Sequence, residues 1–376
     1  MTKAEILART DSLFRNLLLK MNPELSVKIY SSARKVFIEL LSQEIKYPPY
    51  VPSENEKIKL WDINFNCSLF NAAGMFKKGE AYYTVASQGA GAYIAGTTTG
   101  MERRGNEKLN IMHPFMPYPK SSSASNWMGL PNEGHSKVAK KLAGINKLNG
   151  CPLGISLSTD PGMKEETAMG LLIEGLKLYE KANVDFIELN ESCPNVPHGN
   201  CDIDDSGLDK NLLKRLEIVS KNFLSYRKRN LPVIIKLSND TDTNLLVPMI
   251  NYLIELGFDG INLGNTSLDY NLFQQLVSLK DKSNFEYFST NFGGGLSGRI
   301  LKEKSLNLTH IASNYLKTLK LSKEFHIIRT GGIENYLDLI ESKNAGISLN
   351  QWFTGYFDMF SKYGHKVYQR LFEGKF

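Results

Sequence analysis

The chain has 376 residues, 42% of them hydrophobic and 22% charged, and a formal net charge of +6. This composition is typical of a folded globular protein, and the length suits either one large α/β barrel or two ordinary domains. Because the Lys and Arg residues are spread along the chain without basic clusters, the charge argues against a nucleic-acid-binding protein.

The cysteines and the hydropathy pattern bear on where the protein resides. Cys67, Cys151, Cys193 and Cys201 form no CxxC pair and no disulfide-dense pattern, which favours a reducing, intracellular compartment. No apolar run approaches the roughly 18 residues of a membrane-spanning helix, and no signal peptide with a cleavage site is visible. We therefore expect a protein without a transmembrane helix.

Residues 1–57 predict two short amphipathic helices followed by a linker. Asn22 and Pro23 indicate the N-cap and the first turn of the second helix. The stretch "YPPYVPSENEK", residues 47–57, cannot continue a helix and is typical of a linker. Apolar residues recur at helical spacing in both segments: Leu7, Phe14, Leu17, Leu18 and Met21, then Leu25, Ile29, Ala33, Val36, Phe37 and Leu40.

From residue 58 onward, short β-rich runs alternate with helical patterns such as 165–182 and 244–257. The alternation predicts a parallel (β/α)8 barrel, with a doubly wound open sheet as the alternative. The predicted strands are continuously apolar, as expected when both faces of a sheet are covered. They are 68–74, 92–97, 153–158, 186–190, 233–238, 260–265, 326–332 and 347–355.

Nearly every predicted strand ends in polar or glycine residues. In a parallel barrel these carboxyl ends converge on one mouth, where barrel enzymes carry their chemistry. The two longest connections, 98–150 and 266–325, follow the second and sixth strands, and loops of this length usually carry function or are disordered. The strand-end residues are Asn71 with Gly74, Thr97, Ser156, Asn190, Lys236, Asn265, Gly331 with Gly332, and Thr354.

Three glycine-containing segments predict a phosphate site at that mouth. "GGGLSGR" (293–299) and "RTGGIEN" (329–335) are expected to be turns before helices, and "WFTG" (352–355) follows the last strand. Bare backbone N–H groups at a helix N-terminus bind anions. Each glycine cluster taken alone is equally explained by a tight turn.

Two side chains at strand ends indicate redox or acid–base chemistry. Lys236 closes an apolar strand, so its ammonium either balances negative charge on a reduced cofactor ring or reaches water. Cys193 is either a small buried hydrophobe or a base whose thiolate is stabilised by its surroundings. The neighbouring Asn190 and Asn195 offer donors and acceptors to a planar, amide-bearing ligand.

Seven motifs in register resemble the FMN-dependent dihydroorotate dehydrogenases of pyrimidine synthesis. In chain order they are "AAGMFKKG", "NWMGLPNEG", "LNESCPN", "VIIKLS", "GNTS", "GGLSGR" and "TGG", and they run from about residue 58 to the end. The resemblance implies that residues 58–376 form an FMN-binding (β/α)8 catalytic barrel that oxidises (S)-dihydroorotate to orotate.

The resemblance also implies roles for individual residues, and no metal. Cys193 is implied as the base that takes a proton from C5 of the substrate while a hydride passes from C6 to flavin N5. Lys77 is implied to meet the substrate carboxylate, and Lys236 to lie at the N1/O2 edge of the flavin. Further substrate-binding residues are implied to be Asn126, Met128, Gly129, Leu130, Asn190, Asn195, Asn265 and Thr266. Further FMN-binding residues are implied to be Ala73, Gly74, Thr97, Ser156, Asn190 and Gly264, with Gly298, Gly332, Phe353 and Thr354 at the phosphate.

The markers of the electron acceptor are mixed. The N-terminal helices and "GGLSGR" are similar to the membrane-associated branch that reduces a quinone, but that branch normally has Ser at Cys193, Asp at Phe76 and Asn at Ser156. Cys193 and "MGLPN" are similar to soluble branches that use fumarate or, through a partner subunit, NAD. We expect a quinone, with fumarate or NAD as alternatives, and a protein in the cytoplasm or peripheral on the inner membrane.

The N-terminal helices are expected to dock on the barrel mouth and to lead a quinone from the membrane to the flavin. Their apolar stripe is wider than two helices can bury against each other. The alternative is a structural cap that only closes the barrel. The residues expected to flank the stripe and to favour an anionic lipid surface are Arg15, Lys20, Lys28, Arg34 and Lys35.

Three further hypotheses compete with this interpretation. A related FMN barrel acting on a neutral dihydropyrimidine such as dihydrouracil has no need of Lys77. A flavin-binding barrel without activity would serve as a partner module. A metal site is the third hypothesis, because residues 198–205 contain the potential ligands His198, Cys201, Asp202, Asp204 and Asp205. The spacing of these ligands matches no standard zinc or EF-hand pattern.

Overall fold

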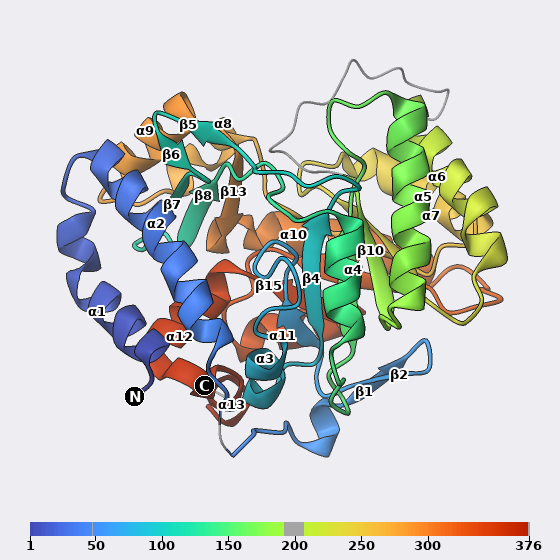
Figure 1. The fold of residues 1–376 in the computed structure, drawn as a ribbon, viewed down its shortest axis with the longest axis horizontal. Helices are drawn as coiled ribbons and strands as arrows, with labels where there is room; N and C mark the ends of the chain where they lie inside the picture. Colours follow the sequence, from blue (N-terminus) through green and yellow to red (C-terminus); the bar gives the residue numbers. More distant parts are fainter. Residues whose placement is uncertain (47, 192–206, 375–376) are drawn as a thin grey trace.

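A barrel of eight parallel strands forms the centre of the protein, seen here in a computed structural model that describes residues 1–46, 48–191 and 207–374 (Figure 1). The strands are hydrogen-bonded in the order β3-β15-β14-β12-β11-β10-β9-β4. Seven lie within predicted segments, and β4 extends one residue beyond 92–97, so the barrel is confirmed and the doubly wound sheet is wrong. Their bounds are β3 (Leu69–Asn71), β4 (Tyr93–Thr98), β9 (Leu153–Leu157), β10 (Phe186–Asn190), β11 (Val233–Leu237), β12 (Gly260–Leu263), β14 (His326–Thr330) and β15 (Leu349–Trp352).

The sheet closes between β3 and β4 through an asparagine side chain. Asn71 Nδ2 donates to the carbonyl of Ile94 at 2.8 Å, and the N–H of Ile94 donates to Asn71 Oδ1 at 3.2 Å. An isolated parallel bridge joins Phe76 to Ala95. These contacts stand in for a regular ladder, which leaves the barrel nearly closed.

A layer of apolar side chains fills the interior of the barrel, and a hairpin packs against it. The hairpin consists of β1 (Ile58–Leu60) and β2 (Ile63–Phe65), and its Trp61 and Phe65 are buried in the same cluster. Because side chains alternate along a strand, the interior positions that follow Phe186 on β10 are Glu188 and Asn190. The layer itself consists of Phe70, Ile94, Phe186, Ile234, Ile328 and Leu349.

Helices cover the outside of the barrel (Figure 1). Apolar residues on the outward faces of the strands, such as Ile155 and Ile235, belong to one core cluster with helix residues such as Leu176 and Leu216. The helices are α3 (Tyr82–Gln88), α4 (His135–Ala143), α5 (Glu165–Lys181), α6 (Lys210–Asn222), α7 (Leu246–Glu255), α10 (Lys302–Leu316), α11 (Tyr336–Asn344), α12 (Thr354–Tyr363) and α13 (Val367–Glu373).

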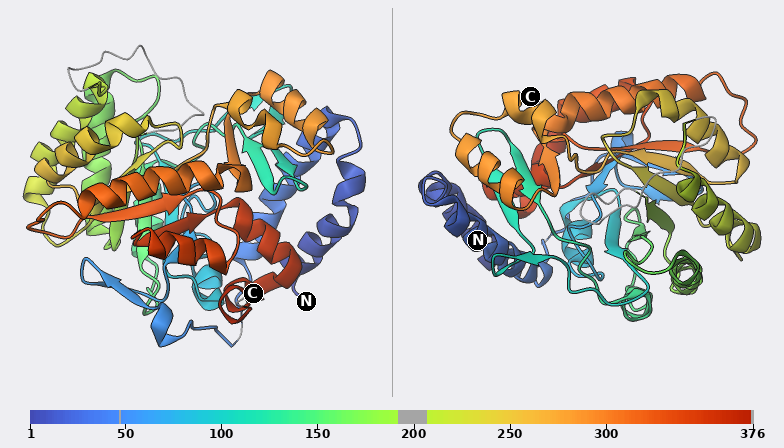
Figure 2. Two further views of the ribbon diagram at one scale, coloured as in Figure 1. Left: turned by 180° about the vertical axis from the view of Figure 1, so that it is seen from behind. Right: turned by 90° about the horizontal axis from the view of Figure 1, so that it is seen from above.

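The two long connections meet beside the mouth of the barrel (Figure 2). β13 pairs with β8, and β8 pairs with β7, in a three-stranded antiparallel sheet. The prediction that 293–299 is only a turn is therefore wrong, since residues 295–298 form a strand after the turn at Gly293 and Gly294. The elements of the connections are β5 (Glu107–Lys108), β6 (Ile111–Met112), β7 (Phe115–Tyr118), β8 (Ser123–Asn126), α8 (Tyr270–Phe273), α9 (Lys282–Asn291) and β13 (Gly295–Gly298).

The N-terminal helices α1 (Lys3–Leu18) and α2 (Pro23–Ser42) pack on one side of the barrel, against α12, β7 and α9 (Figures 1 and 2). Asn22 caps α2 by accepting the N–H of Glu24 at 2.8 Å, which confirms the predicted start of this helix. No helix in the described ranges is long and apolar enough to cross a membrane. Part of the helical stripe joins the main core through Ala4, Ala8, Phe37, Ile38 and Leu41.

Candidate active site

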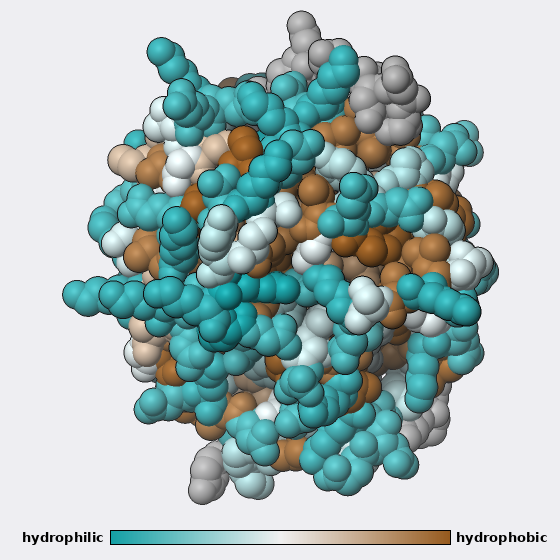
Figure 3. Space-filling view, turned by 90° about the vertical axis from the view of Figure 1, so that its right-hand side faces the viewer, coloured by the Kyte–Doolittle hydropathy of each residue, from teal (hydrophilic) through white to brown (hydrophobic). Residues whose placement is uncertain are grey.

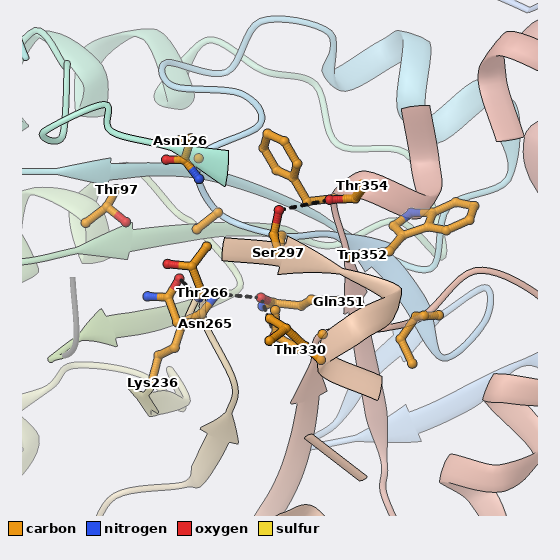
Figure 4. Close-up of a pocket in the computed structure, with 18 of the residues that line it drawn as sticks. Thr97, Asn126, Lys236, Asn265, Thr266, Ser297, Thr330, Gln351, Trp352 and Thr354 are labelled. Atoms are coloured by element: carbon orange, nitrogen blue, oxygen red, sulfur yellow. Dashed lines mark hydrogen bonds between the residues drawn. The ribbon is translucent and has the colours of Figure 1, made fainter. Parts of the chain in front are cut away.

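A pocket lies at the carboxyl ends of the barrel strands, where the mouth was predicted (Figure 4). Its volume, including space open to solvent, is about 920 Å³. Fifteen of the residues assigned by resemblance line it. They are Ala73, Gly74, Lys77, Thr97, Asn126, Met128, Leu130, Asn190, Lys236, Asn265, Thr266, Gly298, Gly332, Phe353 and Thr354.

Three assigned residues lie behind the pocket wall. Ser156 is fully buried, and its hydroxyl is 3.1 Å from that of Thr97. Gly129 has a φ of +69°, and a Cβ there would stand 2.1 Å from Asn106, so this glycine shapes the loop. A Cβ at Gly264 would stand 1.8 Å from the carbonyl of Thr330, which makes this glycine a requirement of strand packing.

The assigned base Cys193 and Asn195 lie outside the described residues, as do the potential metal ligands of 198–205. Among the residues that are described, no group of His, Cys, Asp and Glu is arranged to hold a metal ion. The described cysteines Cys67 and Cys151 are both buried, and burial raises the pKa of the Cys67 thiol to about 12.

Several lining residues were given no individual role in the sequence analysis, although some of them lie in its quoted segments. Gln351 is the most consequential, because a polar residue inside the last apolar strand is a signal that was available. Thr330 stands directly before two glycines, as a strand-end residue similar to those that were selected. The remainder are Ala72, Ser297, Leu301, Gly331, Ile333, Trp352 and Gly355.

One wall of the pocket is a chain of hydrogen-bonded amides and hydroxyls at the carboxyl ends of β12, β10, β4 and β9. Asn265 Nδ2 donates to Asn190 Oδ1 at 3.2 Å, and Asn190 Nδ2 donates to Thr97 Oγ1 at 3.1 Å. Thr97 in turn contacts Ser156. The contacts fix the orientation of both asparagine amides, so their remaining donors and acceptors are presented to a ligand in a defined arrangement.

Lys236 lies at the inner end of the pocket with a buried ammonium group. It is 2% exposed, which rules out the alternative that it reaches water. Its Nζ donates to Gln351 Oε1 at 2.9 Å and stands 3.4 Å from Glu188 Oε1. Burial lowers the pKa of Lys236, and the Glu188 carboxylate opposes that shift. The pocket therefore has a cation at its base, and Figure 4 shows it grouped with Asn265, Thr330 and Gln351.

The opposite end of the pocket has the features of an anion site. Thr354 and Gly355 begin α12, and the first N–H groups of a helix have no acceptor within it. Ser297 Oγ on β13 is 3.0 Å from Thr354 Oγ1 (Figure 4). Gly298 has a φ of +103°, and a Cβ there would stand 2.6 Å from Ser123 Cα, so only glycine fits. This backbone cradle suits the phosphate of a nucleotide cofactor.

A second cavity, of about 890 Å³, lies between the N-terminal helices and the barrel. It shares Phe353 and Thr354 with the first pocket, so the two cavities meet at the start of α12. Its walls are mostly apolar. The apolar lining residues are Leu7, Ala8, Ala33, Phe37, Phe115, Pro117, Pro119, Ala124, Phe353 and Phe357.

A few charged groups interrupt this apolar lining. Arg15 Nε donates to Asp11 Oδ2 at 2.7 Å, and its NH1 stands 3.5 Å from Asp358 Oδ1. Tyr30 donates its hydroxyl to Asp11 Oδ1 at 3.0 Å. Arg34 Nε is buried and has no hydrogen-bond acceptor in the part of the chain that is described, and burial lowers the pKa of Arg34 to about 10. The expectation that Arg15 and Arg34 flank a lipid surface is therefore wrong, because both line the cavity.

Known proteins share both the sequence pattern and the fold. A quinone-type dihydroorotate dehydrogenase from Akkermansia muciniphila is 26% identical over 344 residues, which is 91% of this chain and 91% of the relative. One from Buchnera aphidicola is 28% identical over 347 residues, 91% of this chain and 94% of the relative. The ligand-free crystal structure of DHODH from Eimeria tenella superposes with a TM-score of 0.73 at 20% identity, covering 94% of this chain and 93% of that one.

The family profile described as dihydroorotate dehydrogenase matches residues 56–373. This range includes the whole barrel, both long connections and every described residue of the first pocket. The chain therefore belongs to the dihydroorotate dehydrogenase family.

Proposed function

We propose that this protein oxidises dihydroorotate to orotate with FMN and passes the electrons to a quinone. One observation carries the proposal: a single pocket joins Lys77, the asparagine amides, the buried Lys236 and the backbone cradle at α12. A small anionic diamide needs Lys77 and the asparagine amides. A flavin needs Lys236 beside its ring and the backbone cradle at its phosphate. Family membership implies a flavin cofactor, and the phosphate cradle supports FMN as its form.

The chain's own residues have distinct tasks in this chemistry. Bound FMN supplies a hydride acceptor. Lys77 and the amides of Asn126, Asn190 and Asn265 orient the substrate, since a charge-assisted bond and several fixed amides give a planar diamide one pose. Lys236 would supply a positive charge at the base of the pocket to a bound flavin that gains electrons. Cys193, three residues after Asn190 in the chain, is proposed to take the proton from C5.

The second cavity is proposed as the route of the quinone. It is apolar, as a quinone ring and its tail require, and it meets the first pocket at Phe353 and Thr354. The buried Arg34 Nε–H can donate a hydrogen bond to a quinone carbonyl oxygen. The curated relatives named above are quinone enzymes, which supports this acceptor over fumarate or NAD.

Peripheral membrane binding is proposed for the outer face of the helix pair. Several apolar side chains of this pair remain outside the core and are 41% to 79% exposed, among them Leu13, Phe14, Leu17, Met21, Leu25 and Val36. Lys28 and Lys35 on α2 and Lys20 in the turn before it are also exposed and can contact anionic lipid. On the opposite side of the molecule, hydrophilic side chains predominate and hydrophobic ones lie in smaller groups between them (Figure 3).

The proposal is tested by the colour of the purified protein. We expect one FMN per chain, bleaching of the flavin absorbance by anaerobic dihydroorotate, and recovery on addition of a short-chain quinone. Dihydrouracil should not bleach it, because Lys77 then has no carboxylate to bind. A folded protein that cannot be loaded with FMN, or one bleached equally by dihydrouracil, refutes the proposal.

A further inference from the structure

Glu188 is a buried carboxylate for which the proposed reaction has no direct use. It lies on β10 two residues before Asn190, so its side chain points into the barrel. It is 1% exposed and does not line the pocket. Along the same strand, Phe186 belongs to the apolar layer. The carboxylate therefore lies between that layer and the base of the pocket.

The contacts of Glu188 connect it to the lysine that faces the pocket. Its Oε2 accepts hydrogen bonds from Asn262 Nδ2 and Gln351 Nε2, both at 2.8 Å. Its Oε1 stands 3.4 Å from Lys236 Nζ. Gln351 closes the group by accepting from Lys236 Nζ at 2.9 Å. Glu188, Gln351 and Lys236 thus form a closed buried group in which the carboxylate is held on the side of the ammonium away from the ligand.

Stability alone gives a weak reason for this arrangement. Replacing a buried ion pair by apolar residues of similar volume is often neutral or stabilising. A lone buried lysine, on the other hand, tends to lose its proton. A carboxylate behind Lys236 has two consequences: it keeps the ammonium charged, and it reduces the positive field that the pair presents to the pocket.

We propose that Glu188 is a positioning residue that holds Lys236 in place and sets the reduction potential of the bound flavin. The inference rests on the proposed function. Uptake of two electrons and one proton by the flavin leaves one negative charge at the ring. Lys236 favours that charge and Glu188 opposes it, so the pair keeps the potential below the value that a lysine without a counter-ion would give. A lower potential assists the transfer of electrons to the acceptor.

The test is the midpoint potential of the FMN-loaded full-length protein, measured by dye-linked anaerobic titration. Because the negative charge of the reduced ring keeps Lys236 protonated in the absence of the carboxylate, Glu188→Gln should raise the potential by about 30 to 60 mV, which is a tenfold to hundredfold shift in a two-electron equilibrium. Glu188→Asp retains the charge and should stay near the wild-type value. Asn262→Ala removes a hydrogen bond to Glu188 without removing charge and should also stay near it.

The outcomes separate this inference from the proposed function. A wild-type protein that does not bind FMN, or is not reduced by dihydroorotate, refutes both. Suppose that the wild-type protein binds FMN and is reduced by dihydroorotate. A Glu188→Gln potential within 10 mV of the wild-type potential then refutes only the role of Glu188. A rise in the potential of Asn262→Ala equal to that of Glu188→Gln also refutes only this role. If Glu188→Gln does not fold, Gln351→Glu adds a carboxylate beside Lys236 and should lower the potential; an unchanged or raised value refutes the role.

Discussion

The two cavities of this protein differ in almost every property except their meeting point. The barrel pocket is lined by amides, two lysines and bare backbone, whereas the cavity under α1 and α2 is lined mainly by aliphatic and aromatic side chains. Both include Phe353 and Thr354. The first suits an anionic polar substrate, and the second suits an apolar one.

The difference indicates how one cofactor can serve two reactants of opposite polarity. A ligand that reaches the barrel pocket is recognised by oriented hydrogen bonds, which exclude apolar molecules because buried amides would lose their partners. A ligand in the helix cavity is recognised mainly by apolar burial. Changes in one cavity should therefore leave the half-reaction of the other intact.

The largest difference between the effects on the two half-reactions is expected from a change of the proposed base, Cys193. Cys193→Ala should slow flavin reduction by dihydroorotate by about 10²- to 10⁴-fold, the usual effect of losing a general base, and leave reoxidation by quinone unchanged. Cys193→Ser should retain part of the activity with an optimum at higher pH, because a hydroxyl loses its proton less readily. Stopped-flow absorbance measures both steps. Undiminished reduction in Cys193→Ala would assign the base elsewhere, and Cys151→Ala is the buried control.

The exposed apolar face of α1 and α2 is expected to bind membranes, and vesicle binding tests this expectation. Leu13→Glu combined with Leu17→Glu should weaken binding to anionic lipid vesicles more than tenfold, since burial of each leucine contributes about 1.5 to 3 kcal/mol. Leu13 is 79% exposed and Leu17 64%. Co-sedimentation with vesicles measures the change. Tyr226→Glu, at a residue 77% exposed outside the helix pair, is the control, and an equal loss there would contradict a specific lipid face.

A smaller effect is expected at the substrate carboxylate. Lys77→Ala should weaken orotate binding about ten- to hundredfold through loss of a charge-assisted bond, with FMN affinity changed far less. Titration calorimetry of the FMN-loaded protein measures it. The neighbouring Lys78 pairs with Glu133 at 3.0 Å and does not line the pocket, so Lys78→Ala should bind orotate normally. Equal wild-type affinity for orotate and uracil would contradict the role of Lys77.

A separate effect, on stability and not on a half-reaction, is expected near the junction of the cavities. Burial raises the pKa of Glu334 to about 7, and Asp358 adds to the shift while Arg299 opposes it. The folded protein thus retains a proton that the unfolded chain releases near pH 4.5, so stability falls as the pH rises from about 4.5 to 7.

Glu334→Gln should remove this dependence. Between pH 5 and pH 8 the variant should gain up to about 3 kcal/mol relative to the wild type in urea unfolding at saturating FMN. Glu303→Gln, at an exposed position nearby, should show no such gain. A Glu334→Gln protein whose stability follows the wild type at both pH values would show that this carboxyl is ionised throughout.

The repeating part of the fold could be predicted because each strand carries its own signal. Continuous apolar runs such as 233–238 end in polar residues, and barrel closure brings those ends together. The three-stranded sheet could not be predicted, since Ser123–Asn126 and Gly295–Gly298 are short, polar or glycine-rich strands whose pairing depends on contacts across the mouth. The same holds for Asn71, whose role in closing the barrel follows only from its position opposite Ile94.

The candidate site shows a similar division. Residues within motifs that follow the chain order of the family, such as Lys77 and Asn126, were identified by resemblance and line the pocket. Gln351 and Glu188 were missed because each is a polar residue inside a predicted core strand, and their significance depends on Lys236 on another strand. The orientation of Arg15 was misjudged for a related reason: besides Asp11 on the same helix, it contacts Asp358, which is far along the chain on α12.

The central claim is that one flavin is reduced from the barrel pocket and reoxidised from the helix cavity, and double-mixing stopped flow tests it directly. Ala33 lines the helix cavity, and Ala33→Phe should fill it. The account predicts that Ala33→Phe slows reoxidation by a short-chain quinone at least tenfold and leaves reduction by dihydroorotate at the wild-type rate, because only the apolar route is blocked. Val36→Phe, at a 50% exposed position on the same helix, should change neither step. Unchanged quinone reoxidation in Ala33→Phe, or equal slowing of both half-reactions, would contradict the account.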